Sequence, residues 1–207
     1  MNPDSFNKVF IGSGLMAEML LHTLIYHKGE SPKDFYVLGS DVERCKQLME
    51  KYNIRATTNF NAFIAKAKVV VLAVDVDKIQ DIQIIAEEIR EKVPPTALIN
   101  SVTPNLKIAE IENFFPNHPV MRLGLNLSAI SGNNIGSYIC GSITPEDIAP
   151  VAKFLMDTFG DFIECEDEEE FDKICMVIHA ISCGNYFSFN CILDSLMKLG
   201  YLMPSTR

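Results

Sequence analysis

The stretch KVFIGSGLMA, at residues 8–17, decides how this chain folds. It begins with a short apolar run that is typical of a buried β-strand. It continues as Gly-x-Gly-x-x-Ala, and apolar residues at helical spacing follow as far as His27. A glycine loop between a first strand and a helix is the fingerprint of a dinucleotide-binding unit. The sequence therefore predicts that the chain opens with a Rossmann-type α/β domain.

The residue types in this loop suit a bound pyrophosphate. A first glycine allows the tight turn, and a second glycine lets the backbone approach the ligand because it has no side chain. A small residue at position 17 lets the helix pack close to the strand, and the free N–H groups of the first helical turn face the phosphates. The alternative is a loop that only turns the chain. The candidate cofactor-binding residues here are Gly12, Ser13, Gly14, Leu15, Met16 and Ala17.

Beyond the loop, apolar runs alternate with helical patterns. Strands are expected at residues 8–12, 35–38, 54–57, 69–74, 97–100, 120–123, 137–140 and 161–164. Helices are expected at residues 15–27, 42–52, 60–66, 79–92 and 145–159. This alternation predicts βαβ units and a doubly wound, mostly parallel sheet. The acidic run at 164–170 precedes a long helical pattern, so we place a domain junction there, between 1–164 and 165–207.

The residues after the second expected strand bear on the identity of the dinucleotide. NAD-binding domains usually end this strand with Asp or Glu, which holds the ribose hydroxyls. Gly39 takes that place here, and Ser40 and Arg44 are candidates for contact with a 2′-phosphate. The sequence therefore favours NADP. NAD is the alternative if the strand reaches Asp41, and Arg44 is otherwise a solvated helix charge.

Composition and charge argue against several other classes of protein. The formal net charge is −9, which disfavours a nucleic-acid partner. None of the six cysteines forms a Cys-x-x-Cys pair, so no metal site is expected, and reduced thiols fit a cytoplasmic protein. The amino-terminal residues do not resemble a signal or transit peptide. The uncharged stretch at 174–193 contains too many polar groups for a membrane span and favours a helix in a protein interface.

With these motifs in hand, the chain resembles the pyrroline-5-carboxylate reductase family over nearly its whole length. The family's first loop reads Gly-x-Gly-x-Met-Ala, which residues 12–17 match. Ala73 and Val74 resemble part of its Ala-Val-Lys-Pro segment, which lies beside the nicotinamide, so both join the cofactor-binding candidates. Residues 122–132 keep the spacing of its Arg-Val-Met-Pro-Asn-Thr-Pro-Ala-x-x-Gly segment, and 180–184 resemble its Leu-Ser-Gly-Ser-Gly motif.

This resemblance implies a reaction, a substrate class and an assembly. The family transfers a hydride from nicotinamide C4 to the C=N carbon of pyrroline-5-carboxylate, the last step of proline biosynthesis. A small-molecule substrate is implied, with Asn126 and Ser182 as substrate-binding candidates, while no catalytic residue is assigned. The family's C-terminal helices interlock with a partner subunit. A homo-oligomer through the expected helix at 168–200 is therefore implied.

The chain also departs from the family pattern. Asp75-Val76 stands where the family has Lys-Pro, so a negative charge replaces a positive one. The family continues beyond the position of Arg207 with more helices and a loop that holds the substrate. Residues 165–207 are then expected to be the first helix or helices of a truncated all-α dimerisation domain. The alternative functions are a catalytically silent NAD(P)-binding or interaction relative, and a reductase of another two-domain Rossmann family.

Overall fold

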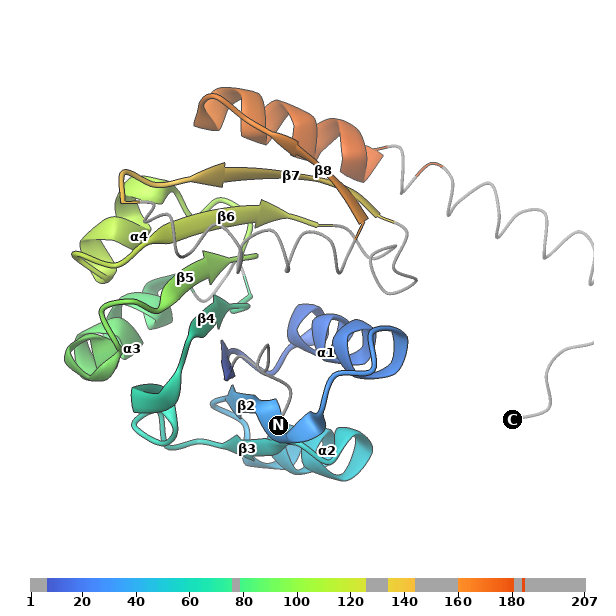
Figure 1. Cartoon of the computed structure of the whole chain (residues 1–207), viewed down its shortest axis with the longest axis vertical. Helices are drawn as coiled ribbons and strands as arrows, with labels where there is room; N and C mark the ends of the chain where they lie inside the picture. The colour runs from blue at the N-terminus through green and yellow to red at the C-terminus, as the bar shows by residue number, and fades with distance from the viewer. Residues whose placement is uncertain (1–6, 76–78, 126–133, 144–159, 181–183, 185–207) are drawn as a thin grey trace, which may run out of the picture.

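Eight strands form one sheet, in the spatial order β3-β2-β1-β4-β5-β6-β7-β8 (Figure 1). This computed structural model describes residues 7–75, 79–125, 134–143, 160–180 and 184. The strands are β1 (Lys8–Ile11), β2 (Phe35–Leu38), β3 (Arg55–Thr57), β4 (Val69–Leu72), β5 (Leu98–Ser101), β6 (Val120–Gly124), β7 (Asn134–Cys140) and β8 (Gly160–Glu164). Neighbouring strands are parallel except β6 and β7. The order of the first six is that of a Rossmann sheet, which confirms the predicted fold class.

Helices cover both faces of this sheet. They are α1 (Leu15–His22), α2 (Val42–Tyr52), α3 (Ile79–Ile89) and α4 (Ile108–Phe114), and residues 168–180 are also helical. α1 continues into a π-helical turn at Thr23–His27, and α3 into a 3₁₀ turn at Arg90–Lys92. In Figure 1, α1 and α2 lie on one side of the sheet, and α3 and α4 lie on the other. The strand order therefore reverses between β1 and β4: from β1 the sheet extends to β3 on one side, and from β4 it extends to β8 on the other.

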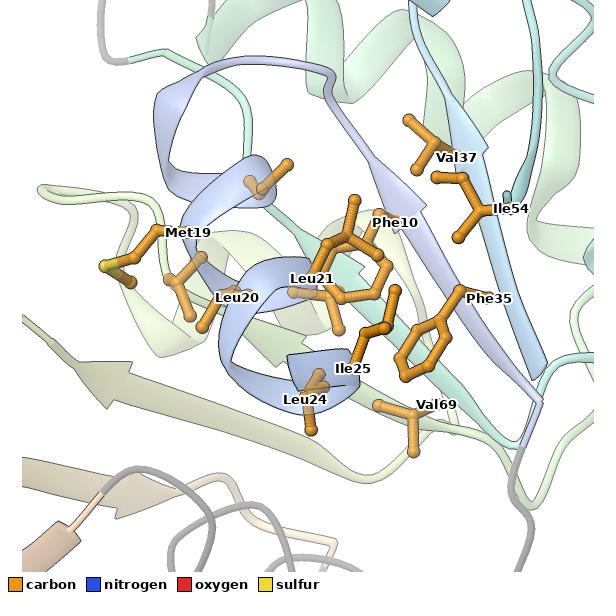
Figure 2. Packing of buried hydrophobic residues seen from close by; sticks show 14 of the residues in the cluster. Phe10, Met19, Leu20, Leu21, Leu24, Ile25, Phe35, Val37, Ile54 and Val69 are labelled. Atoms are coloured by element: carbon orange, nitrogen blue, oxygen red, sulfur yellow. The ribbon is translucent and has the colours of Figure 1, made fainter. Parts of the chain in front are cut away.

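The two faces carry separate apolar clusters. Phe10, Phe35 and Leu20 belong to the cluster beneath α1 and α2, and Figure 2 shows how closely its side chains interdigitate. Val9 and Ile82 belong to the opposite cluster, beneath α3 and α4. Burial on both faces explains why the strands read as continuous apolar runs rather than alternating patterns. A rigid sheet of this kind fixes the position of the loops at its carboxyl edge.

The 168–180 helix packs on β7. A third, smaller apolar cluster joins the helix to the sheet and consists of Ile139, Cys165 and Phe171, the last from the helix itself. In addition, the hydroxyl of Ser137 on β7 lies 3.1 Å from the sulfur of Cys175 on the helix. The helix begins at Glu168, inside the acidic run at 164–170, so part of the run lies in its first turn. The division of the chain into domains 1–164 and 165–207 stays a prediction.

The structure corrects one predicted helix and adds one that was not predicted. Residues 60–66 do not form a helix: side chains of the preceding residues cap tight turns, Phe63 has a φ of 67°, and only a 3₁₀ turn follows at Ile64–Lys66. Conversely, α4 is not predicted by the sequence. The predicted helix at 145–159 lies outside the described residues.

Candidate functional site

The glycine loop is held at its first residue by both neighbouring strands. The N–H of Gly12 donates to the carbonyl oxygen of Leu38 at 2.8 Å, and Gly12 has a φ of 114°. A Cβ built on Gly12 would lie 2.3 Å from the carbonyl oxygen of Ala73. Both the dihedral angle and the close approach require glycine. The tight turn therefore depends on β2 and β4 as well as on the loop itself.

The loop leads directly into α1, whose N-cap is Gly14. Gly14 has no side chain that could accept hydrogen bonds from the N–H groups of the first turn. These N–H groups therefore stay available to donate to a bound phosphate. The next three residues differ in environment: Leu15 is exposed, Met16 is half-buried against the core, and Ala17 is fully buried. The burial of Ala17 allows the close packing of helix on strand that this motif needs.

A cavity of about 220 Å³ opens beside the loop, and we call it the loop cavity. Its wall includes these predicted cofactor-binding residues: Gly12, Ser13, Gly14, Ser40 and Val74. Four other predicted residues are not part of this wall: Leu15, Met16, Ala17 and Ala73. The wall also includes Phe60, Asp81 and Ile85, which no sequence signal marks, because they come from segments far from the loop along the chain.

The residues at the end of β2 agree with the prediction that the dinucleotide is NADP rather than NAD. β2 ends at Leu38, and a Cβ on Gly39 would lie 2.6 Å from the hydroxyl of Ser13, so an acidic residue does not fit there. Asp41 caps α2 instead, because its carboxylate accepts from the N–H groups of Glu43 (2.9 Å) and Arg44 (3.1 Å). Ser40 is exposed at the wall of the loop cavity.

Arg44 braces the loop from α2. Its Nε donates to the carbonyl oxygen of Ser13 at 2.9 Å, and its guanidinium forms an ion pair with Glu18 of α1. Glu18 also accepts from Lys51 at 2.7 Å and from Tyr52 at 3.1 Å. Arg44 is therefore neither a solvated helix charge nor an unengaged cation. Its role as a contact for a 2′-phosphate stays a prediction.

This network changes the acidity of Glu18. Burial alone would raise the pKa of Glu18, but the hydrogen bonds from Lys51 and Arg44 outweigh burial and lower the pKa from 4.5 to about 2. The carboxylate is thus charged at every pH at which the protein is expected to work. It links α1 to α2 just behind the glycine loop.

Glu18→Gln is expected to destabilise the protein near neutral pH and to have a much smaller effect at about pH 2.5. The folded pKa of Glu18 lies below its unfolded value, so its stabilising effect is complete above pH 4.5 and is lost as the pH falls towards 2. Urea unfolding of both proteins near neutral pH, at about pH 4 and at about pH 2.5 measures the difference. A difference that stays constant with pH would contradict an ionic origin.

A second cavity, of about 540 Å³, lies where the 168–180 helix meets the carboxyl ends of β5 and β6. Its wall includes Thr103, Arg122, Leu125 and His179. The substrate-binding candidates Asn126 and Ser182 lie outside the described residues. Leu125 is nevertheless the direct neighbour of Asn126 in the sequence. We call this space the helix cavity.

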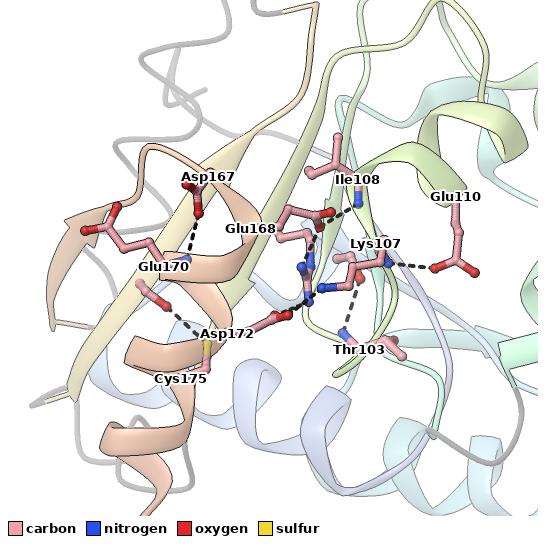
Figure 3. A network of polar contacts seen from close by, with 12 residues as sticks. Thr103, Lys107, Ile108, Glu110, Asp167, Glu168, Glu170, Asp172 and Cys175 are labelled. Carbon is pink, nitrogen blue, oxygen red and sulfur yellow. Dashed lines mark hydrogen bonds and ion pairs between the residues drawn. The ribbon is translucent and has the colours of Figure 1, made fainter.

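Arg122 lies beside the helix cavity and pairs with Glu168 and Asp172, which belong to the polar network that Figure 3 shows. Its side chain is 3% exposed, and it donates to Glu168 at 2.6 Å and to Asp172 at 3.3 Å. The guanidinium also lies 4.4 Å from the centre of the Phe171 ring. Sequence reasoning noted Arg122 only through its spacing in the family segment. Its partners belong to the acidic run, which by itself indicates a helix N-terminus and not an ion pair with Arg122.

Thr103 connects the two cavities. Its hydroxyl lies within hydrogen-bonding distance of the carbonyl oxygens of Leu72 (3.2 Å) and Val74 (3.0 Å), which share its one proton. Val74 is part of the wall of the loop cavity, and Thr103 is part of the wall of the helix cavity. The end of β4 is therefore held in place from the loop after β5. No motif marks this threonine in the sequence.

The described residues contain no cluster of three or more His, Cys, Asp or Glu side chains that would hold a metal ion. Burial raises the pKa of Cys165 to about 11 and also raises those of Cys45 and Cys175. These thiols therefore stay protonated near neutral pH, which makes them poor metal ligands and poor nucleophiles. Among the helices in the described part of the chain, none is long and apolar enough to span a membrane.

Comparisons with known proteins agree with this geometry. Residues 8–103 match the family model described as NADP oxidoreductase coenzyme F420-dependent. Pyrroline-5-carboxylate reductase 2 of Bacillus subtilis (strain 168) is 29% identical over 156 residues, which cover 73% of this chain and 54% of that protein. Pyrroline-5-carboxylate reductase 1 of the same strain is 24% identical, over 80% of this chain and 56% of that protein. The chain thus spans about half the length of these curated relatives.

Solved structures show the same fold. A pyrroline-5-carboxylate reductase from Coxiella burnetii has a TM-score of 0.80 at 21% identity, covering 97% of this chain and 73% of that one. A pyrroline carboxylate reductase from Plasmodium falciparum, solved with NADP bound, has a TM-score of 0.72 at 16% identity, covering 95% of this chain and 69% of that one. In its glycine loop and its sheet the chain is therefore similar to the pyrroline-5-carboxylate reductases.

Proposed function

We propose that this chain binds NADP(H) in the loop cavity and forms the cofactor-binding part of a reductase that acts on a cyclic imine such as pyrroline-5-carboxylate. The observation that carries the proposal is the glycine loop. Gly12 is fixed by β2 and β4, and Gly14 opens α1 at the wall of the loop cavity. This is the arrangement that a pyrophosphate needs. NADPH, when bound, supplies the hydride.

The residues of this chain have separate parts in holding the cofactor. Gly14 and the N–H groups of the first turn of α1 bind the pyrophosphate. Ser40 contacts the 2′-phosphate, which favours NADP over NAD because Gly39, directly after β2, has no carboxylate and the neighbouring Asp41 is engaged as the cap of α2. Thr103 holds the backbone of Val74 at the wall of the loop cavity. The remaining candidates, Leu15, Met16, Ala17 and Ala73, support the loop from behind or beside it.

The substrate site is proposed in the helix cavity. It lies next to the loop cavity through Thr103 and Val74, and it adjoins Leu125, whose neighbour Asn126 is a substrate-binding candidate together with Ser182. We also propose a homo-oligomer through the 168–200 segment, with the domain junction at residue 164, because Met176 and Val177 on the 168–180 helix are strongly exposed. The buried thiols of Cys45 and Cys165 form no disulfide, which fits a protein of the cytoplasm.

Titration calorimetry with NADPH and NADH, followed by addition of pyrroline-5-carboxylate with absorbance recorded at about 340 nm, tests this function. NADPH is expected to bind with a dissociation constant of about 1 μM, or about −8 kcal/mol, and more tightly than NADH. Turnover of pyrroline-5-carboxylate is expected to consume the bound NADPH. Failure of a folded sample to bind either nucleotide would contradict the proposal.

A second candidate function, a catalytically silent NAD(P)-binding or interaction protein, has one specific observation in its favour. Asp75 places a negative charge at the wall of the loop cavity, where the related family has a lysine. Such a protein would bind nucleotide without consuming it. Reduction of any cyclic imine by the purified protein decides against this alternative.

A further inference from the structure

Asp75 lies over the glycine loop. It follows the end of β4 by three residues, and its side chain is exposed at the wall of the loop cavity. A Cβ built on Gly14 would lie 3.1 Å from Oδ1 of Asp75 and 3.6 Å from Oδ2. Both carboxylate oxygens therefore approach the residue at which the backbone must come closest to a pyrophosphate.

The carboxylate of Asp75 has no hydrogen-bond or ion-pair partner among the residues that the structure describes. The other charged groups on the same wall are Asp41, Asp81 and Arg44. Asp41 is occupied as the cap of α2, and Arg44 is paired with Glu18 and bonded to Ser13. Among the residues that the structure describes, three carboxylates and one engaged guanidinium thus line the cavity that is proposed to hold the dinucleotide. The N-terminus of α1 attracts phosphate, and Asp75 lies beside it.

We propose that Asp75 sets the affinity of the loop cavity for dinucleotides: its charge opposes the pyrophosphate at the N-terminus of α1. This inference rests on the proposed function and deepens it. An anion at a helix N-terminus is favoured by the helix dipole, so the carboxylate of Asp75 competes for the same partial positive charge that would hold the ligand. The protein therefore binds its cofactor more weakly than its loop geometry alone allows.

The position of Asp75 implies that it affects the affinity for both nucleotides and not the preference between them. The pyrophosphate is common to NADPH and NADH, whereas the 2′-phosphate that distinguishes them is proposed to lie at Ser40. Removal of the charge at residue 75 is therefore expected to tighten the binding of both nucleotides by the same factor. The ratio of their dissociation constants is expected to stay unchanged.

The test is titration calorimetry of NADPH and NADH with the wild-type protein, Asp75→Asn, Asp75→Lys and Asp161→Asn. Asp75→Asn is expected to lower both dissociation constants by about tenfold, and Asp75→Lys by about tenfold more, from Coulomb energies near a protein surface. Because Asp75 is exposed to solvent, the gain is expected to shrink as NaCl rises from about 0.05 M to about 0.5 M. Asp161 on β8 is exposed and lies outside the loop cavity, so Asp161→Asn controls for net charge and is expected to change nothing.

Equal affinities of the wild-type protein and Asp75→Asn would overturn this inference while leaving the proposed function intact. A gain of the same size with Asp161→Asn would overturn it as well, because the effect would then come from net charge. If neither nucleotide binds to any of the four folded proteins, both the inference and the proposed function fail. Binding that becomes measurable only in the Asp75 variants would support both.

Discussion

Gly12→Ala is expected to lower the free energy of unfolding by about 3–5 kcal/mol, the sum of a strained dihedral angle and an overpacked contact. Gly12 has a φ of 114°, and the new Cβ would meet the carbonyl oxygen and carbon of Ala73 at 2.3 and 2.7 Å. These are backbone atoms of a strand end, so they cannot rotate away as a side chain does. The strain is relieved only if the loop moves relative to β4, which would also deform the loop cavity.

Gly29→Ala is the matched control for this experiment. Gly29 also has a positive φ, of 68°, but no atom lies within 4 Å of a Cβ built there. This variant is expected to lose only about 1 kcal/mol, from the dihedral angle alone. Urea unfolding of the two variants gives both values. Equal losses would show that contact with Ala73 does not restrict residue 12.

Glu168→Gln is expected to lower the free energy of unfolding by about 2–3 kcal/mol, because it leaves the buried Arg122 with one carboxylate instead of two. Glu168 is the nearer of the two partners, at 2.6 Å, and it also accepts from the N–H of Ile108 at 2.9 Å. Glutamine keeps the shape and the carbonyl oxygen of the side chain. The loss therefore measures the charge rather than the packing.

Glu169→Gln provides a control in the same helix with the same chemical change. Glu169 is 77% exposed and pairs with Lys173, four residues later. Exposed pairs of this type contribute little, so the expected loss is about 0.5 kcal/mol or less. Similar losses for the two variants in urea unfolding would show that Arg122 does not depend on Glu168.

Much of the sheet was predictable from the sequence because burial on both faces leaves continuous apolar runs. β1, β2 and β4 are four-residue strands that coincide with such runs, and α2 begins and ends at its predicted residues. α4 was missed because part of its stabilisation is not local. It has only seven residues, and the N–H at its first residue, Ile108, donates to Glu168, which lies 60 residues away.

The candidate site was predictable where a backbone motif defines it. The glycines at 12 and 14 line the loop cavity because the motif itself specifies the turn. The roles of Arg44 and Thr103 were not predictable, since each depends on which carbonyl oxygen a side chain reaches after folding. The position of Asp75 over Gly14 depends in the same way on the path of the chain after β4.

During synthesis, β1 emerges from the ribosome before the other strands, yet it lies in the interior of the finished sheet, between β2 and β4. β4 follows β1 by about 60 residues, which is a delay of about 3–12 s at typical elongation rates. Until β4 arrives, one edge of an apolar strand has unpaired N–H and C=O groups that can pair with another chain. Codon changes that slow translation of residues 39–68 would therefore prolong a period of aggregation risk without altering a single amino acid of the mature sheet.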